Sequence, residues 1–193
     1  MARILVFGGS FSPPTLAHEA IIGGCLALPG FAELWVMPSA DRTDKQIGVS
    51  GQHRLAMLEA VQREIFHSDP RLRISDFELQ LPAPSATART VAALETTYPA
   101  HEFWFVFGTD SYYDMPHWPD GARLQATLKL VIINRGTEPL PSRPGIRPLR
   151  INGMTAISST QTRQVLQAGA DSDTLLSQPV QAYIHAHQLY HVA

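Results

Sequence analysis

Short runs of β-branched and aromatic residues alternate along this chain with longer runs whose apolar residues recur at helical spacing. Strands that alternate with helices are typical of a parallel α/β sheet, because each helix carries the chain back to the start of the next strand. Five such strands with intervening helices predict a doubly wound parallel sheet. The strands are expected at 3–7, 32–38, 72–80, 102–108 and 128–135, with a shorter one at 146–152.

The helical runs follow the strand-like runs. The most regular one covers 51–66, where Leu55, Leu58, Val61 and Ile65 trace one face of a helix. Glycine or proline follows several of the others, as expected where a helix ends. These helices are expected at 16–28, between 87 and Pro99, at 159–167 and at 179–189.

Composition narrows the class of protein. A length of 193 residues with 45% hydrophobic residues suits one sizeable core, so 1–193 is interpreted as a single domain. The formal charge of −2 gives no electrostatic footprint for a nucleic acid or an anionic membrane. The single cysteine, Cys25, lies in an apolar helical pattern typical of a packed thiol. With no bilayer-spanning run and no signal-peptide pattern, a cytoplasmic protein is expected.

The turn after the first strand, GGSFSPPTLAH at 8–18, lies where ligands of an open parallel sheet bind, outside the carboxyl ends of the strands. Gly8, Gly9 and Ser10 allow the backbone to approach a phosphate or a ring closely. The following helix directs its unpaired N–H groups at the same place, so the turn predicts an anion cradle. Its spacing matches neither the Walker loop nor the dinucleotide fingerprint.

Thr15 and His18 stand three residues apart at the start of this helix and therefore share a face. A hydroxyl and an imidazole that project together can bind two oxygens of a phosphate chain. The alternative interpretation is that Thr15 is an N-cap and His18 is an ordinary, partly buried histidine. The neighbouring glycine turn favours the phosphate interpretation.

A second phosphate-binding pattern is ISSTQTR at 157–163. Ser158, Ser159 and Thr160 offer three hydroxyls around a helix N-terminus, and Arg163 follows one turn later. Hydroxyls, unpaired N–H groups and a guanidinium in one place suit phosphate oxygens. A Ser/Thr cap with a solvated arginine is the alternative.

A third segment, FGTDSYYDMPHW, begins where the buried strand 102–108 ends. Gly108, Thr109 and Asp110 should therefore face the same crevice. Asp110 can accept hydrogen bonds from ribose hydroxyls or help to hold a divalent cation. Trp118 suits stacking on a flat ligand, with core packing as the alternative.

Together, these three segments resemble the nicotinate/nicotinamide mononucleotide adenylyltransferases, which belong to the nucleotidyltransferase superfamily with (H/T)-x-x-H and ISST-x-x-R signatures. HRLAMLEAV and VQAYIHAHQLY are also similar to segments of that family, so the likeness extends over nearly the whole chain. It implies a Rossmann-like fold and transfer of the adenylyl group of ATP, with Mg²⁺, to nicotinate mononucleotide. The products would be deamido-NAD and pyrophosphate, a step of NAD biosynthesis.

Three alternatives stay open at this point. The first is another phosphate acceptor, such as nicotinamide mononucleotide, phosphopantetheine or an alcohol phosphate, with ATP or CTP as donor. The second is a nucleotide-binding module without turnover. The third is a hydrolase of the same fold class, which would need a carboxylate pair or a metal cluster. His185, His187 and His191 are interpreted as surface residues, because only the last two share a helical face.

The resemblance also assigns residues. Thr15, His18 and Arg163 would be catalytic, and no protein residue is assigned as a metal ligand. The mononucleotide would be bound by Lys45, Thr87 and Trp118. ATP would be bound by Gly8, Gly9, Ser10, Phe11, His18, Gly108, Asp110, Ile157, Ser158, Ser159, Thr160 and Arg163.

The chain departs from the family pattern at three positions. Ser12 stands where an Asp or Asn is usual, Ala17 where a glycine is frequent, and Ala86 where the family has the tyrosine of a Ser-Tyr-Thr stretch. None of these changes removes a phosphate-binding group. Ser12 and Ala86 bear instead on which acceptor nucleotide is used.

Overall fold

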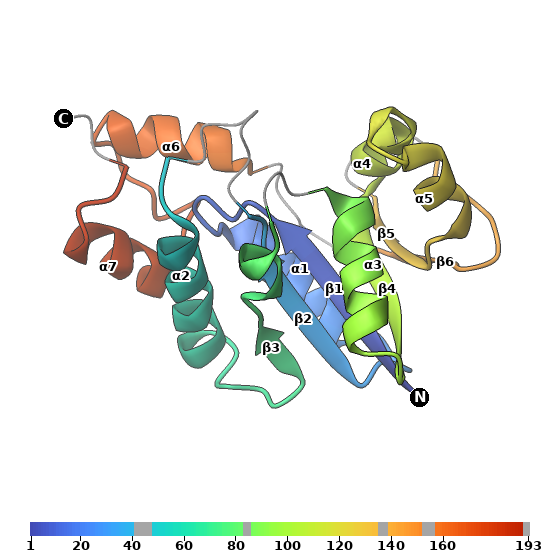
Figure 1. Cartoon of the computed structure of the whole chain (residues 1–193). Coiled ribbons are helices and arrows are strands. Elements are labelled where there is room, and N and C mark those ends of the chain that lie inside the picture. The colour runs from blue at the N-terminus through green and yellow to red at the C-terminus, as the bar shows by residue number, and fades with distance from the viewer. Residues whose placement is uncertain (41–47, 83–85, 135–138, 152–156, 191–193) are drawn as a thin grey trace.

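Six parallel strands form one sheet within the residues that the computed structural model describes, which are 1–40, 48–82, 86–134, 139–151 and 157–190 (Figure 1). The strand order is β3-β2-β1-β4-β5-β6, so the doubly wound parallel sheet predicted from the sequence is confirmed. The short segment expected after the five main strands supplies the sixth strand by pairing with β5. The strands are β1 (Ala2–Gly9), β2 (Glu33–Pro38), β3 (Leu72–Ile74), β4 (His101–Gly108), β5 (Leu130–Ile133) and β6 (Ile146–Leu149).

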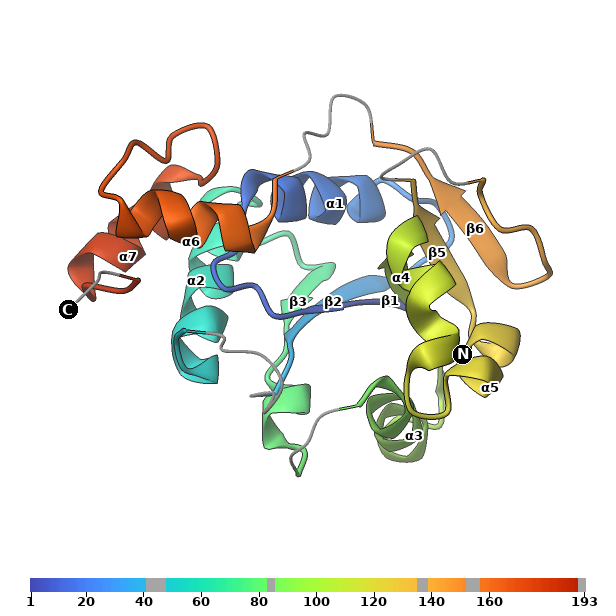
Figure 2. The same ribbon diagram turned by 90° about the horizontal axis from the view of Figure 1, so that it is seen from above.

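Helices cover both faces of the sheet, and α1 and α3 lie on opposite sides of it (Figure 2). The N-terminal half of the sheet is flanked by α2, which also packs against α7 near the end of the chain. No described helix is long and apolar enough to cross a membrane. The helices of more than six residues are α1 (Leu16–Leu26), α2 (Gly51–Glu64), α3 (Thr87–Thr97), α5 (Gly121–Thr127), α6 (Ser159–Gln167) and α7 (Gln178–Ala186).

Two hydrophobic clusters fill the space between the sheet and its helices. Successive side chains of a strand point to opposite faces, so Leu5 and Phe7 of β1 join the cluster under α1 and α2. Ile4 and Val6 join the cluster under α3 and α5. Cys25 of α1 is buried in the first cluster, which confirms the packed thiol, and this burial raises its pKa to about 12.

The two central strands separate at their carboxyl ends. In the described chain, β1 and β4 are paired only as far as Val6 and Phe105. Beyond that point β1 stays paired with β2 to Gly9, and β4 stays paired with β5 to Gly108. The order of the sheet reverses here, so the divergence opens the switch-point crevice where ligands of such sheets bind.

Two short helices follow β4, in a segment for which the sequence analysis expected no helix or strand. They are α4 (Thr109–Asp114) and the 3-10 helix η2 (Met115–His117). Helices of this length are marginal by propensity and depend on tertiary packing, here on the buried Met115. The turn into α5 requires Gly121, because a Cβ there would lie 1.8 Å from the Met115 carbonyl oxygen.

The strand predicted over 72–80 is wrong beyond β3. The segment turns after Ile74, and the 3-10 helix η1 (Phe77–Gln80) follows. The hydroxyl of Ser75 accepts the N–H of Phe77 at 3.3 Å, a local bond that competes with strand pairing.

The predicted apolar face of α2 is also partly wrong. Ile65 lies beyond the helix and is exposed, whereas Arg54 and Met57 are fully buried together with Leu58 and Val61. The buried face is therefore rotated toward the opening turn, and it carries an arginine into the interior.

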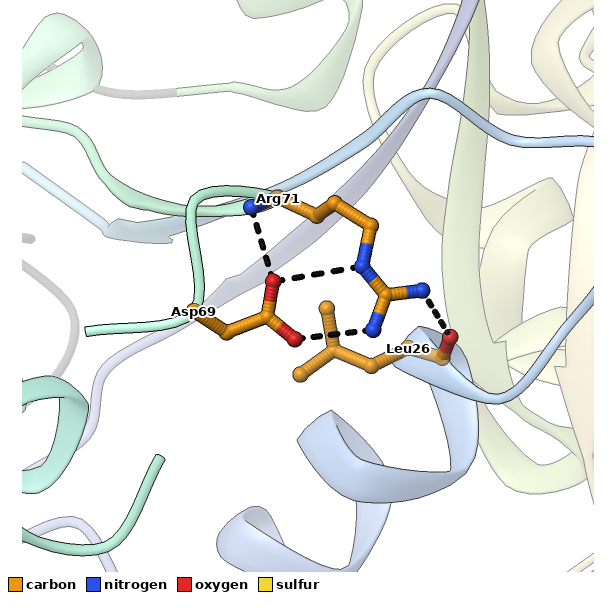
Figure 3. Close-up of polar contacts among 3 residues, drawn as sticks. All are labelled: Leu26, Asp69 and Arg71. Carbon is orange, nitrogen blue, oxygen red and sulfur yellow. Dashed lines mark hydrogen bonds and ion pairs between the residues drawn. The ribbon is translucent and has the colours of Figure 1, made fainter. Parts of the chain in front are cut away.

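The amino-terminal edge of the sheet holds a polar cluster of Leu26, Asp69 and Arg71 (Figure 3). Two guanidinium nitrogens of Arg71 donate to the Asp69 carboxylate at 3.2 and 2.8 Å, and a third donates to the Leu26 carbonyl at 3.0 Å. The hydrogen bonds from Arg71 lower the pKa of Asp69 below its ordinary value. A cation therefore stands at the C-terminus of α1, where the helix dipole favours it.

Candidate functional site

The opening turn leaves β1 at the crevice between β1 and β4. Gly8 is exposed, and a Cβ added there would meet no described atom within 4 Å. A Cβ on Gly9 would instead meet the Phe11 ring at 3.2 Å. The backbone is thus accessible at Gly8, whereas Gly9 packs tightly against the Phe11 ring.

His18 is held by the residue that precedes α1. The backbone N–H of Thr15 donates to Nδ1 of His18 at 3.0 Å, and the Thr15 hydroxyl lies 2.8 Å from the same nitrogen. A ring nitrogen that accepts a backbone N–H carries no proton, so the neutral imidazole bears its proton on Nε2. This tautomer gives His18 a hydrogen-bond donor for an anionic oxygen.

Thr15 is the N-cap of α1 and a hydrogen-bond partner of His18, so the N-cap interpretation is confirmed, and phosphate binding by this pair stays a prediction. Its backbone is extended before the helix begins, with φ −122° and ψ 166°. The residue is fully buried, whereas His18 is half-buried.

Phe11 supports the histidine from beneath. Its ring meets the His18 ring edge-on at 5.0 Å and the Phe7 ring at 5.3 Å. Its φ of 46° is unfavourable for a residue with a side chain, so this packing must offset the strain. Phe11 is wholly buried and therefore fixes the turn without lining the crevice surface.

The start of α6 lies directly on the opening turn. The Ser159 hydroxyl donates to the Pro13 carbonyl at 3.0 Å, and the Arg163 guanidinium donates to the Ser12 carbonyl at 2.7 Å. A further Arg163 nitrogen donates to the Thr160 hydroxyl at 3.3 Å. The two phosphate-binding patterns, at opposite ends of the chain, thus meet through direct hydrogen bonds.

The other residues of the second pattern surround the N-terminus of α6. Ser158 is the N-cap of α6, and its hydroxyl accepts the Gln161 N–H at 3.2 Å. Ser158 and Thr160 are exposed, and Ile157 is half-buried. Helix N-terminus, hydroxyls and guanidinium therefore lie together, as a triphosphate site requires.

Arg54 of α2 is a site residue that the sequence analysis missed. It is fully buried, and its guanidinium donates to the Ser10 carbonyl at 2.9 Å. The signal was its place in the i, i+3, i+4 and i+7 pattern that it forms with Met57, Leu58 and Val61. A charged residue on the buried face of a helix indicates a partner in the interior.

The third segment follows β4 at the other side of the crevice. Gly108 and Thr109 are buried, and Asp110 is exposed in the first turn of α4. The buried Thr109 hydroxyl has no hydrogen-bond partner in the described chain. An exposed carboxylate therefore lies close to the carboxyl end of β4.

Two of the three residues expected to bind the mononucleotide lie on the face of the sheet that α3 covers, and the third lies outside the described residues. Thr87 is the first residue of α3, and it is half-buried. Trp118 is also half-buried; its indole N–H donates to the Asp114 carboxylate at 2.8 Å, and its ring meets Phe107 edge-on at 5.6 Å. Lys45 lies outside the described residues.

Residues near the end of the chain fix the first turn of α1. The Leu16 N–H donates to the Leu175 carbonyl at 2.9 Å, and the Ser177 hydroxyl donates to the Glu19 carboxylate at 2.5 Å. Burial raises the pKa of Glu19, against the lowering effect of the Ser177 hydrogen bond. The start of α1 is thus anchored on the side away from the crevice.

The model of the cytidylyltransferase-like family matches residues 6–165 of this chain. The chain therefore belongs to this family. The matched part of the chain contains the opening turn, the segment after β4 and the start of α6.

Within this family, relatives that match the chain over nearly its full length share one description. Proteins described as "Probable nicotinate-nucleotide adenylyltransferase" are 32% identical in Albidiferax ferrireducens, over the whole of both chains, and 32% identical in Symbiobacterium thermophilum, over 98% of this chain and 96% of the relative. The solved nicotinic acid mononucleotide adenylyltransferase of Plasmodium falciparum, complexed with NaAD, is 25% identical. It superposes with a TM-score of 0.85 and covers 98% of each chain.

Proposed function

We infer that this chain transfers the adenylyl group of ATP to nicotinate mononucleotide, giving deamido-NAD and pyrophosphate. The observation that carries this inference is the contact between the two signature segments, in which the Ser159 hydroxyl donates to the Pro13 carbonyl and Arg163 donates to that of Ser12. The names of the relatives and the NaAD complex of the Plasmodium enzyme support the same reaction.

The chemistry needs alignment and charge neutralisation more than proton transfer. An oxygen of the mononucleotide 5′-phosphate attacks the α-phosphorus of ATP, and the bond from that phosphorus to the bridging oxygen of the β-phosphate breaks. The attacking oxygen is already an anion, so no general base is required. We propose that His18 and Arg163 donate to the oxygens on which charge develops.

Mg²⁺ is proposed to enter with ATP as part of the substrate. The described residues include no group of three His, Cys, Asp or Glu side chains placed to hold a metal. Mg²⁺ commonly bridges substrate phosphates, keeps several waters and takes one or two carboxylates. The exposed Asp110 at the crevice is the carboxylate that we propose can approach it.

For the acceptor, we propose that Thr87 binds the pyridine carboxyl group, that Trp118 stacks on the ring, and that Lys45 contributes positive charge. Ala86, the N-cap of α3, carries no polar side chain next to Thr87. The hydroxyl of Thr87 then becomes the main side-chain contact that this segment offers. A cytoplasmic location, a single domain over 1–193 and the absence of nucleic-acid and membrane partners stay predictions.

Pyrophosphate release by the purified protein with Mg-ATP tests the reaction. Nicotinate mononucleotide, nicotinamide mononucleotide and phosphopantetheine are supplied in parallel as acceptors. The proposal predicts release with nicotinate mononucleotide, formation of deamido-NAD in equal amount, and a lower kcat/KM with the amide. Turnover with phosphopantetheine alone, or ATP binding without turnover of any acceptor, would contradict it.

A further inference from the structure

Tyr190 at the end of the described chain reaches into the opening turn. Its hydroxyl lies 3.0 Å from the Ser12 hydroxyl, in a buried hydrogen bond that joins residues 178 positions apart. The same residue, Ser12, accepts Arg163 through its backbone carbonyl at 2.7 Å. Ser12 therefore connects the C-terminal segment to the arginine of the second signature.

The surroundings of Tyr190 indicate a fixed, neutral phenol. The residue is buried among Met57 and Val61 of α2 and Val180 and Ile184 of α7. Burial raises its pKa to about 12, so the hydroxyl keeps its proton and can donate to Ser12.

The backbone of Tyr190 gives a second indication. Its φ of 63° lies in the left-handed region, which is unfavourable for a tyrosine. Such a conformation persists only where surrounding contacts determine it. Among the described residues, its contacts include the hydrophobic cluster and the Ser12 hydrogen bond, and the latter reaches the opening turn.

We propose that Tyr190 is a positioning residue for adenylyl transfer, which acts through Ser12 to hold the turn against Arg163 and the start of α6. This role also accounts for the serine at position 12, where the family usually has Asp or Asn. A hydroxyl can exchange a hydrogen bond with a phenol, and unlike an aspartate it buries no charge. This inference rests on the proposed function for its substrates.

The test compares Tyr190→Phe, Ser12→Ala and the double variant. Loss of one such hydrogen bond is expected to lower kcat/KM for ATP about fivefold, with a rise in KM for ATP and an unchanged KM for nicotinate mononucleotide. Because both changes break the same contact, the fall in kcat/KM of the double variant should be no larger than that of the more impaired single variant. A merely structural role would lower the active fraction and leave both KM values unchanged.

Tyr183→Phe is the matched control. Tyr183 lies on α7, a short distance before Tyr190 in the chain, and its hydroxyl lies 3.1 Å from Nδ1 of His53 on α2 rather than next to a residue of the opening turn. Removal of this hydroxyl should leave both KM values and kcat unchanged. Equal losses in Tyr183→Phe and Tyr190→Phe would overturn the proposal, as would a Tyr190→Phe enzyme with wild-type kinetics.

Calorimetric titration with Mg-ATP separates this inference from the proposed function. The dissociation constant of Mg-ATP should rise about fivefold in Tyr190→Phe and Ser12→Ala, but not in Tyr183→Phe. This result would stand even if the wild-type protein turned over no pyridine mononucleotide. Unchanged ATP affinity in both variants would overturn the role of Tyr190 whatever the acceptor.

Discussion

Helix α1 meets polar side chains at both of its ends, and the two ends differ in what those side chains do. At its C-terminus the Leu26 carbonyl accepts from Arg71, which Asp69 holds through two further bonds. At its N-terminus the Thr15 N–H and hydroxyl fix Nδ1 of His18. At one end a side chain pairs with a helix carbonyl, whereas at the other the protein holds one nitrogen of an imidazole.

This difference separates stability from function along a single helix. Backbone groups at helix ends need partners, and an arginine supplies one for the C-terminal end of α1. At the carboxyl edge of the sheet, the Phe11 ring packs against His18 and Arg54 donates to the Ser10 carbonyl, and both contacts hold the turn in place. We therefore expect changes at the carboxyl edge to affect rate more than stability, and changes at the amino edge to do the reverse.

The largest expected effect is that of His18→Ala. The loss of one donor to the transition state typically lowers kcat about 100- to 1,000-fold. The Tm should fall by a small amount, because the buried N–H and hydroxyl of Thr15 lose their Nδ1 partner while Phe11 keeps its contact with Phe7. Initial rates of pyrophosphate release and a thermal melt check both statements.

His185→Ala is the control for this change, since His185 is an exposed histidine on α7. It should retain the wild-type rate. A His18→Ala enzyme with near-normal turnover would contradict the role of the opening turn.

Arg163→Lys is expected to have a smaller effect. Lysine keeps the charge but not the planar fork that bonds the Ser12 carbonyl and the Thr160 hydroxyl together. A fall of about tenfold in kcat/KM for ATP is expected from the lost geometry. Steady-state kinetics at varied ATP concentration would reveal it, and unchanged kinetics would mean that charge alone suffices.

Arg71→Gln tests the other end of the helix. It removes the paired contact with Asp69 and the cation at the C-terminus of α1, so Tm should fall by a small amount. Both kcat and KM should stay within about twofold of the wild-type values. A loss of activity at unchanged Tm would break the comparison between the two ends.

The smallest expected effect is a pH dependence at this same end. Arg71 lowers the pKa of Asp69 in the folded state, so the ionised carboxylate stabilises the fold at any pH above its unfolded value. This contribution is lost as the pH falls through the folded pKa. The Tm difference between wild type and Asp69→Asn should therefore be constant near neutrality and shrink in acid; a difference that grows in acid would reverse the sign.

The sequence predicted the parts of the fold and site that depend on local pattern. The strands, most of the helices and the two candidate phosphate-binding segments follow from hydrophobic periodicity and from residues three or four positions apart, such as Thr15 and His18. The short helices α4 and η2 were missed because packing, not propensity, stabilises them.

The supports of the site could not be predicted in the same way. Arg54 binds Ser10 across 44 positions, and Tyr190 binds Ser12 across 178. Contacts of this separation leave no periodic signal, and only the fold brings the partners together. The sequence therefore predicted candidate ligand-binding residues, whereas the structure was needed to find the residues that hold the opening turn.

The most direct test measures deamido-NAD formation from Mg-ATP and nicotinate mononucleotide by wild type, His18→Ala and Arg71→Gln in one assay, with a thermal melt of each. The account predicts rates within about twofold for wild type and Arg71→Gln, a rate at least about 100-fold lower for His18→Ala, and a small fall in Tm for both variants. Equal loss of activity in the two variants, or activity retained without His18, would contradict it.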